Sequence, residues 1–413
     1  MNILIIGNGF DIAHGLPTKY SDFLEFCYRL RIIFSWGKDE KQYSNKHIKT
    51  WKNWGEKAPG KYLIEAFQSR KTAIIPNEKL YSLVSYENTN KYVQEMYECI
   101  NNNIWYNYFE NIYKENLING ENWIDFESEI KRIVKLFDEH TGYMNSAFKE
   151  WVIDDEGENE FLQIFFGLLS DNVWKMFRLS NNKDEKYIIR FKDLNQIMND
   201  DLDKITRCLE IYLTDCVEKI GTIKKSKEIE DILSEFSDIR VFSFNYTHTL
   251  ETIYKIDSNH IHYIHGECKK ENTIGTDNMV LGIDEYWSET ERNLHTNYAT
   301  FKKFWQRIIK GTKNDYREWL AECKNENTKS RRIKELVTGT REFSNLYIFG
   351  HSLDATDKDL LREFLLHPGI CTTIYYYNKV AFGQQVTNLI GVLGQDYLNQ
   401  MYKIGKIRFI QQQ

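Results

Sequence analysis

The sequence opens with a glycine-containing turn of the kind that binds phosphates. Residues 3–6 are a short apolar run, typical of a strand buried on both faces, and the run ends at Gly7. A Gly-x-Gly turn after such a strand leaves backbone N–H groups free to approach a diphosphate, and the following helix adds the positive end of its dipole. The third glycine of the dinucleotide fingerprint is replaced by Ile12. We predict a nucleotide-binding turn made of Gly7, Asn8, Gly9, Phe10 and Asp11; the alternative is a turn that only joins strand to helix.

Two further residues of this segment carry polar side chains. A carboxylate is an awkward neighbour for a phosphate, so Asp11 is expected either to cap a helix or to hold a ribose hydroxyl. His14 is interpreted as structural.

Polar residues also follow three other expected strands. Asn245 comes after the strand over 239–244, and His265 comes after the strand over 261–264. Gly350 and Ser352 follow the strand over 346–349. Ligands of open α/β sheets bind outside the carboxyl ends of the strands, so these residues should face the same crevice as the first turn. The alternatives are a turn residue at 245 and a histidine at 265 that satisfies a structural hydrogen bond.

Asp125 and Glu127 form a second, weaker candidate pair. Asp125 precedes an amphipathic helix and is predicted to be its N-cap. If the two carboxylates reach the crevice, they could bind ribose, or a metal as in a nuclease.

The segment 301–341 is locally basic, with interspersed aromatic residues that would suit a phosphate backbone. Acidic residues such as Asp315, Glu318 and Glu322 are mixed into it. The interpretation we favour is a solvated helical face.

These residues must be positioned by an α/β core. Strands are expected at 3–6, 239–244, 261–264, 279–283, 346–349, 372–377 and 407–410. Helices are expected between them at 300–309, 316–324 and 357–366. Strands that alternate with helices predict a mostly parallel, Rossmann-like sheet covered on both faces.

The middle of the chain has a different pattern. Helical apolar stripes cover 92–112, 126–137 and 205–220, and a polar loop region surrounds 37–60. We therefore predict three parts: residues 1–35 as the first βα unit, 36–235 as a mainly helical insertion, and 236–413 as the remainder of the core.

Composition limits the function classes. The 413 residues are 42% hydrophobic and 15% aromatic, as in a globular protein, and the net charge of −6 argues against a surface that clamps nucleic acid throughout. None of the seven cysteines forms a C-x-x-C pair, which argues against a zinc ribbon and fits reduced thiols in a cytosol. No run of 18–20 apolar residues and no basic leader is present. A cytoplasmic location without membrane attachment is expected.

Several motifs resemble one known family. Residues 5–23, Ile-Ile-Gly-Asn-Gly-Phe-Asp-Ile-Ala-His-Gly-Leu-Pro-Thr-Lys-Tyr-Ser-Asp-Phe, resemble the opening of the AbiH proteins, abortive-infection factors against bacteriophage. Trp-Ile-Asp-Phe-Glu at 123–127, Phe-Asn-Tyr-Thr-His at 244–248, Ile-His-Gly at 264–266 and Phe-Gly-His-Ser-Leu at 349–353 fit the same family in the same order. The resemblance implies a role in phage defence.

AbiH proteins are in turn distantly similar to the sirtuin-like NAD-binding fold. That similarity implies NAD as substrate or ligand, Asn245 and His265 as catalytic residues, and Gly350 and Ser352 as nucleotide contacts. Thr247 stands where an aspartate usually follows, and the paired cysteines of a sirtuin zinc module are missing, which argues against protein deacetylation. No metal is expected.

The resulting hypothesis is hydrolysis of the bond between nicotinamide and ribose, with His265 as base. Two other classes stay open. One is a module that senses a nucleotide without turnover while the helical part binds a phage or host component. The other is a toxin that acts on nucleic acid. The phage trigger and homo-oligomer formation are likewise left open.

Overall fold

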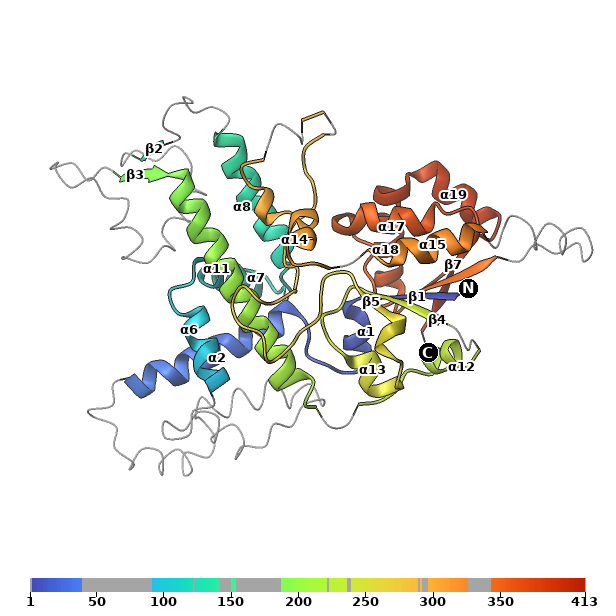
Figure 1. The fold of residues 1–413 in the computed structure, drawn as a ribbon, viewed down its shortest axis with the longest axis horizontal. Coiled ribbons are helices and arrows are strands. Elements are labelled where there is room, and N and C mark those ends of the chain that lie inside the picture. Colours follow the sequence, from blue (N-terminus) through green and yellow to red (C-terminus); the bar gives the residue numbers. More distant parts are fainter. Residues whose placement is uncertain are drawn as a thin grey trace, which may run out of the picture.

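One open sheet organises the chain. The computed structural model describes residues 2–38, 91–121, 123–141, 150–153, 187–220, 223–235, 239–288, 290–291, 296–312, 314–325 and 343–412. Six strands form an all-parallel sheet in the order β5-β4-β1-β6-β7-β8 (Figure 1). They are β1 (Asn2–Ile6), β4 (Ile239–Ser243), β5 (Ile261–Tyr263), β6 (Ser344–Phe349), β7 (Ile370–Tyr376) and β8 (Ile407–Gln411). The α/β class and the parallel sheet are therefore confirmed.

The strand order places a crevice beside the first strand. Numbered along the chain within this sheet, the strands run 3-2-1-4-5-6, which is the order of sheets that bind dinucleotides. The order reverses between β1 and β6, and ligands of such sheets bind beyond the carboxyl ends of the strands at that point.

Helices cover both faces of the sheet. One apolar cluster joins Ile3, Ile5, Phe242 and Ile348 to α15 (Tyr316–Asn325), α17 (Lys358–Leu365), α18 (Lys379–Leu393) and α19 (Gln395–Lys403). A second cluster joins Leu4, Ile6, Val241 and Phe349 to α1 (Asn8–Ala13), α12 (Lys227–Glu235) and α13 (Thr249–Tyr254). Alternate residues of β1 thus enter different clusters, as the period of a strand requires. Figure 1 shows the two helical layers above and below the sheet.

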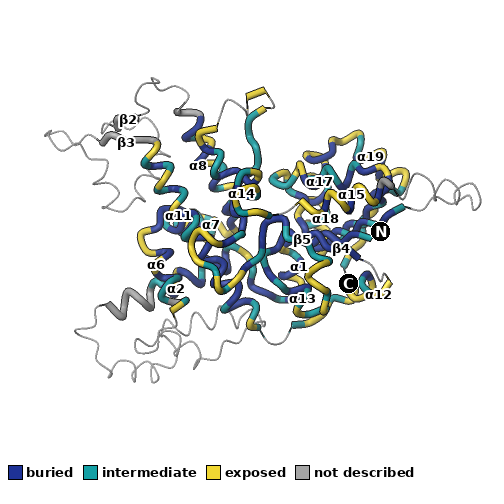
Figure 2. Tube along the Cα trace, viewed as in Figure 1, coloured by how far each residue is buried: buried dark blue, intermediate teal, exposed yellow. Residues whose placement is uncertain are grey.

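A third cluster forms a helical body beside the sheet. It joins α2 (Tyr20–Lys38), α6 (Lys91–Ile100), α7 (Ile104–Ile118), α8 (Phe126–Thr141), α11 (Phe191–Tyr212) and the π-helical turn Leu213–Val217. The strands β2 (Glu150–Ile153) and β3 (Tyr187–Arg190) pair antiparallel at its end. Figure 2 shows buried residues in both the sheet and this body. The three-part division at 35 and 235 stays a prediction; of the polar loop region, residues 39–60 lie outside the described part.

Two details of the predicted elements are wrong. The apolar run 279–283 is not a strand of the sheet: Met279, Leu281 and Ile283 are buried in the core of the helical body instead. The stripe over 92–112 is two helices, because Asn102 has a left-handed φ of 59° and Asn103 accepts a hydrogen bond from the N–H of Tyr106 as the N-cap of α7.

Within the described part of the chain, no helix combines the length and the apolar character needed to cross a membrane.

Candidate functional site

The parallel register brings four strand ends to one level. Ile6 pairs with Ser243 on one side and with Phe349 on the other, and Ser243 pairs with Tyr263. The residues that follow these strands therefore meet at one edge of the sheet.

A pocket of about 680 Å³ lies at this edge, between the sheet and the helical body. This volume is within the range of about 300–1,000 Å³ that is usual for ligand sites. Eight residues of the predicted nucleotide site line it: Gly7, Asn8, Gly9, Asp11, Asn245, His265, Gly350 and Ser352. The second candidate pair, Asp125 and Glu127, also reaches it. Phe10 does not; it is fully buried in the core, against the rings of His14 and Phe349.

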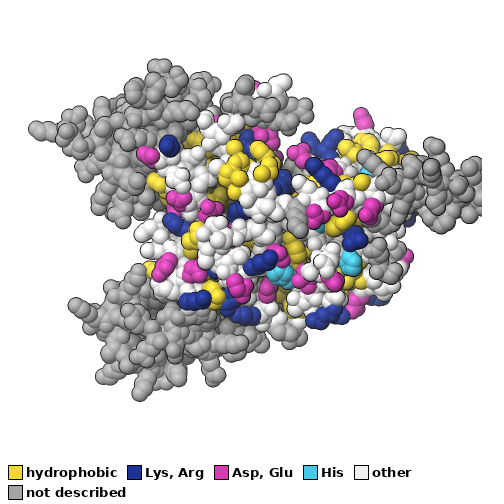
Figure 3. Space-filling model, in the orientation of Figure 1, with side chains coloured by type: hydrophobic (Ala, Val, Ile, Leu, Met, Phe, Trp, Pro, Cys, Tyr) yellow, Lys and Arg dark blue, Asp and Glu magenta, His cyan; other side chains and the backbone are white. Residues whose placement is uncertain are grey.

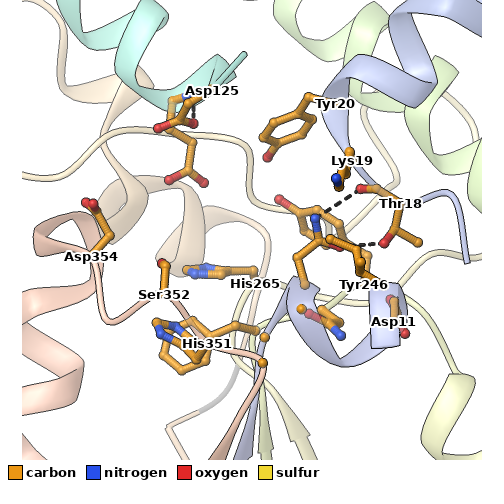
Figure 4. A pocket seen from close by; sticks show the side chains of 18 of the residues that line it. Asp11, Thr18, Lys19, Tyr20, Asp125, Tyr246, His265, His351, Ser352 and Asp354 are labelled. Carbon is orange, nitrogen blue, oxygen red and sulfur yellow. Dashed lines mark hydrogen bonds between the residues drawn. The ribbon is translucent and has the colours of Figure 1, made fainter. Parts of the chain in front are cut away.

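Side chains from several elements surround the pocket. Figure 4 shows Asp11, Thr18 and Lys19 on one side, Asp125 and Asp354 on the other, and His265 between them. Asn8 and Thr18 are joined by two hydrogen bonds: the Thr18 hydroxyl donates to Oδ1 of Asn8 at 2.5 Å, and Nδ2 of Asn8 donates to the Thr18 carbonyl at 3.2 Å. These two bonds hold the segment around Thr18 in place beside the first turn.

The glycines allow two loops to pack together. The N–H of Gly7 donates to the carbonyl of Phe349 at 3.3 Å, and that of Gly9 donates to the carbonyl of Gly350 at 2.7 Å. Gly350 has φ +67°, and a Cβ there would lie 2.0 Å from the nitrogen of Phe10. Both glycine N–H groups are thus already bonded, so the expectation that they are free for a diphosphate is wrong.

Asp11 is a buried carboxylate on the floor of the pocket. It lies inside α1, where Gly7 is the N-cap, so the capping alternative is wrong. The hydroxyl of Thr247 donates to Oδ2 of Asp11 at 2.6 Å, while Oδ1 is buried without a partner among the described residues. Burial raises the pKa of Asp11 to about 6. The site therefore holds a carboxylate with an unused acceptor.

Asn245 also has an unused polar atom. Its backbone N–H donates to the hydroxyl of Ser243 at 3.2 Å, which holds the turn after β4. The side chain is 5% exposed, and Nδ2 has no acceptor in the described part of the chain. An amide donor is thus buried at the pocket wall.

His265 belongs to a buried network of charged groups. Nε2 lies 3.2 Å from Oδ1 of Asp357, and Nζ of Lys303 contacts the same oxygen at 2.9 Å. Lys303 also contacts Oε2 of Glu127 at 2.7 Å. Burial and the nearby Lys303 lower the pKa of His265 to about 4, so the imidazole is neutral near pH 7. Its Nδ1 is buried and has no partner among the described residues.

The charges of this network influence one another. Burial raises the pKa of Glu127 to about 8. Burial acts in the same direction on Asp357, but Lys303, His265 and His351 together outweigh it and hold the pKa of Asp357 well below its usual value. Burial opposes the charge of Lys303, but the two carboxylates outweigh it and raise the pKa of Lys303. We conclude that Lys303 and Asp357 stay charged and that Glu127 is the group that titrates.

The positions of Asp125 and His14 agree with the sequence interpretation. Asp125 accepts from the N–H of Glu127 at 3.1 Å and from the hydroxyl of Ser128 at 2.6 Å, which confirms it as the N-cap of α8. His14 bonds to the Phe10 carbonyl and to the Tyr254 hydroxyl, both at 2.7 Å, which confirms a structural role.

A separate cluster offers three possible metal-ligand atoms. Glu218, His248 and Cys268 place them within 4.8 Å of one another. Nδ1 of His248 lies 2.9 Å from Glu218, and Nε2 lies 3.0 Å from Glu267. Burial acts against the charge, but the two carboxylates outweigh it and raise the pKa of His248 to about 10, so both ring nitrogens donate. We interpret the cluster as an ion-pair network.

Sequence reasoning did not find all the lining residues. Those not singled out include Lys19, Tyr20, Tyr246, Lys303, His351 and Asp357. The sequence signal that could have identified Lys303 was Phe-Lys-Lys-Phe at 301–304, in which two lysines lie between aromatic residues.

The interpretation of the basic segment as a solvated face is wrong at two positions. Lys302 and Lys303 are 2% and 3% exposed, and Lys302 contacts Glu285 at 2.8 Å. The exposed residues of α14 (Lys303–Ile309) are apolar instead: Phe304, Ile308 and Ile309. Figure 3 shows where hydrophobic and charged side chains gather on this face of the molecule. The part of the segment beyond 325 lies outside the described residues.

Comparison with known proteins gives one finding. Residues 3–376 match the family described as bacteriophage abortive infection AbiH. The chain belongs to this family. No curated protein and no solved structure matches it significantly.

AbiH membership makes the chain a protein of phage abortive infection. The match extends over the first turn, all four strand ends and the helical body, so most of the pocket is built from AbiH segments; the lining residues Gln384 and Asn388 lie beyond the match. The distant similarity to sirtuin-like proteins has no support from these comparisons and stays a prediction.

Proposed function

We propose that this AbiH protein binds NAD or a closely related nucleotide in the pocket and hydrolyses the bond between nicotinamide and ribose. The observation that carries the proposal is a set of three buried polar atoms without partners among the described residues, Oδ1 of Asp11, Nδ2 of Asn245 and Nδ1 of His265. All three residues line one pocket at the switch point of a sheet with dinucleotide-binding strand order. Unsatisfied buried polar groups cost free energy, and a ligand with several hydroxyl groups would satisfy them.

The chemistry of the bond suits these residues. Nicotinamide departs from a cationic pyridinium as a neutral molecule, so it needs no general acid. Water adds to the ribose carbon, and the proton that it loses goes to a base, for which we assign Nδ1 of His265. The products are nicotinamide, ADP-ribose and a proton. The amide of Asn245 would hold the water or a ribose hydroxyl.

The charge of the pocket fits a cationic transition state. Five residues with carboxyl groups line the pocket, Asp11, Asp125, Glu127, Asp354 and Asp357, against the two lysines Lys19 and Lys303. With Glu127 protonated near pH 7, the remaining carboxylates still outnumber the lysines. The ribosyl group becomes oxocarbenium-like as the bond breaks, and fixed negative charge stabilises it.

The phosphates need a different location from the one expected at first. Since the N–H groups of Gly7 and Gly9 are bonded to the neighbouring loop, we assign the phosphates to the exposed residues Asn8, Lys19 and Ser352. An ammonium group and a hydroxyl are both good phosphate donors.

The test is product analysis with purified full-length protein. Wild type is incubated with NAD, with ATP and with RNA, and the products are resolved. The proposal predicts release of nicotinamide from NAD, and loss of this activity in Asn245→Ala and in His265→Ala. Matched controls are Asn259→Ala and His260→Ala, which lie in the turn Ser258–His260 and do not line the pocket.

Other outcomes would contradict the proposal. NAD that binds without being consumed would indicate a sensor, and shortened RNA would indicate a toxin that acts on nucleic acid. Because an abortive-infection enzyme can await infection, NAD is also measured in cells that produce each variant, before and after challenge with a panel of phages. NAD consumption that survives in both Asn245→Ala and His265→Ala would rule out the residue assignment.

A further inference from the structure

A line of largely buried ionisable side chains runs from the pocket into the helical body. Its members are His265, Asp357, Lys303 and Glu127, joined by contacts of 3.2, 2.9 and 2.7 Å. They come from four places: the end of β5, the 3-10 turn Ala355–Asp357, the start of α14, and the first turn of α8. Side chains so distant in sequence do not meet by local structure, so the contact is a product of the tertiary fold.

The contacts fix the tautomer of His265. Asp357 stays ionised beside Lys303 and can only accept, so Nε2 of the neutral imidazole must carry the proton and donate to it. Nδ1 is then left with a free lone pair, which agrees with its lack of a partner among the described residues. The free lone pair is what a base for water requires.

The neighbour His351 does not compete for this role. Its Nδ1 accepts the N–H of Leu353 at 2.8 Å, and its Nε2 lies 3.7 Å from Oδ2 of Asp357, beyond hydrogen-bond distance. His351 thus presents a proton and no lone pair to the network. Of the two histidines, only His265 lies within hydrogen-bond distance of Asp357.

We propose that Asp357 is a positioning residue for His265, and that Lys303 holds Asp357 in place by pairing it with Glu127 of the helical body. The assignment of a base role to His265 rests on the proposed function; the tautomer does not. Other charged groups act on the imidazole from the packed elements: Lys303 and Arg307 from α14 disfavour its protonation, and Asp357 favours it.

Two substitutions of Asp357 separate the effect of its hydrogen-bond acceptor from the effect of its negative charge. Asp357→Ala removes the acceptor, but Glu127 ionises more readily once the negative charge of Asp357 is gone. Lys303 then keeps Glu127 as a partner, so the fold should survive. Asp357→Asn keeps an oxygen in reach of both Lys303 and Nε2 of His265, but removes the charge.

The first readout needs no turnover. Nitrogen-15 NMR of the histidine side chains, with the His265 signals assigned from their loss in His265→Ala, reports which ring nitrogen carries the proton. The expected result near neutral pH is a single tautomer with the proton on Nε2 in wild type and Asp357→Asn, and a mixture in Asp357→Ala. A proton on Nδ1 in wild type, or an unchanged tautomer in Asp357→Ala, would overturn the proposal.

The second readout is NAD hydrolysis. In Asp357→Ala we expect kcat to fall by about 10²-fold or more with KM nearly unchanged, because a general base typically contributes about 10²–10⁴-fold. Asp357→Asn should recover part of kcat, with the acid limb of its pH profile displaced to lower pH. Equal losses in both variants without a change of pH profile would mean a merely structural role. Absence of turnover in wild type would refute the proposed function, while the NMR result would still decide the role of Asp357.

Discussion

Replacement of Asp11 by asparagine should change how stability depends on pH. The carboxylate is 1% exposed, and the amide that replaces it would still offer an oxygen to the hydroxyl of Thr247. Burial raises the pKa of Asp11 from 3.8 to about 6, so the folded state binds the proton more tightly than the unfolded state. The contribution of this group to stability is therefore complete below pH 3.8 and is lost as the pH rises through about 6.

The size of the effect follows from the two pKa values. The full difference between 3.8 and about 6 corresponds to about 3 kcal/mol of free energy of unfolding. Between about pH 4.5 and about pH 7.5, the part that is lost is about 2 kcal/mol. Since asparagine does not titrate, the stability of Asp11→Asn relative to wild type should increase by this amount over the same interval.

Chemical denaturation of both proteins at the two pH values measures this difference. Asp231→Asn is the matched control, because Asp231 is exposed on α12 and its replacement should give the same relative stability at both pH values. A relative stability of Asp11→Asn that is independent of pH, or that falls as the pH rises, would refute the account of Asp11 as a desolvated carboxylate awaiting a ligand.

Two further substitutions test the packing around the pocket. Gly350→Ala should cost more than about 2 kcal/mol of free energy of unfolding. A left-handed φ is unfavourable for alanine, and the added Cβ would lie 2.0 Å from the nitrogen of Phe10. A melting temperature equal to that of wild type would contradict this close approach. Lys303→Met should cost about 3–5 kcal/mol near neutral pH, because it leaves the carboxylate of Asp357 buried without its counter-charge. If Asp357→Asn in the same chain restores no stability lost in Lys303→Met, the account of the charge network is wrong.

The edge of the sheet that holds the site could be predicted from the sequence. Each of Gly7, Asn245, His265 and Gly350 follows an apolar run of strand length, and parallel strands end at a common edge. Local pattern and a general rule of topology were therefore enough. The break at Asn102 and Asn103 was missed, although asparagine favours left-handed and N-cap positions.

The rest depended on contacts that sequence pattern does not encode. Lys303 meets Asp357 and Glu127 across 54 and 176 residues of chain, and only the assembled fold shows that its charge is buried. The sequence also could not show whether the N–H groups of Gly7 and Gly9 are free or hydrogen-bonded, because their acceptors belong to the end of β6 and the loop after it. The apolar run 279–283 is as hydrophobic as a strand, but packs on helices.

Equilibrium binding of NAD is the most direct test of the claim that this pocket is a nucleotide site. Calorimetric titration of NAD into wild type, Asn245→Ala and the control Asn259→Ala requires no turnover and no phage trigger. The account predicts saturable binding to wild type and to Asn259→Ala at one site per chain, and binding at least about 10-fold weaker to Asn245→Ala, since one lost hydrogen bond to a buried donor is worth about 1.4 kcal/mol. No detectable binding to wild type, or equal affinity in all three proteins, would contradict it.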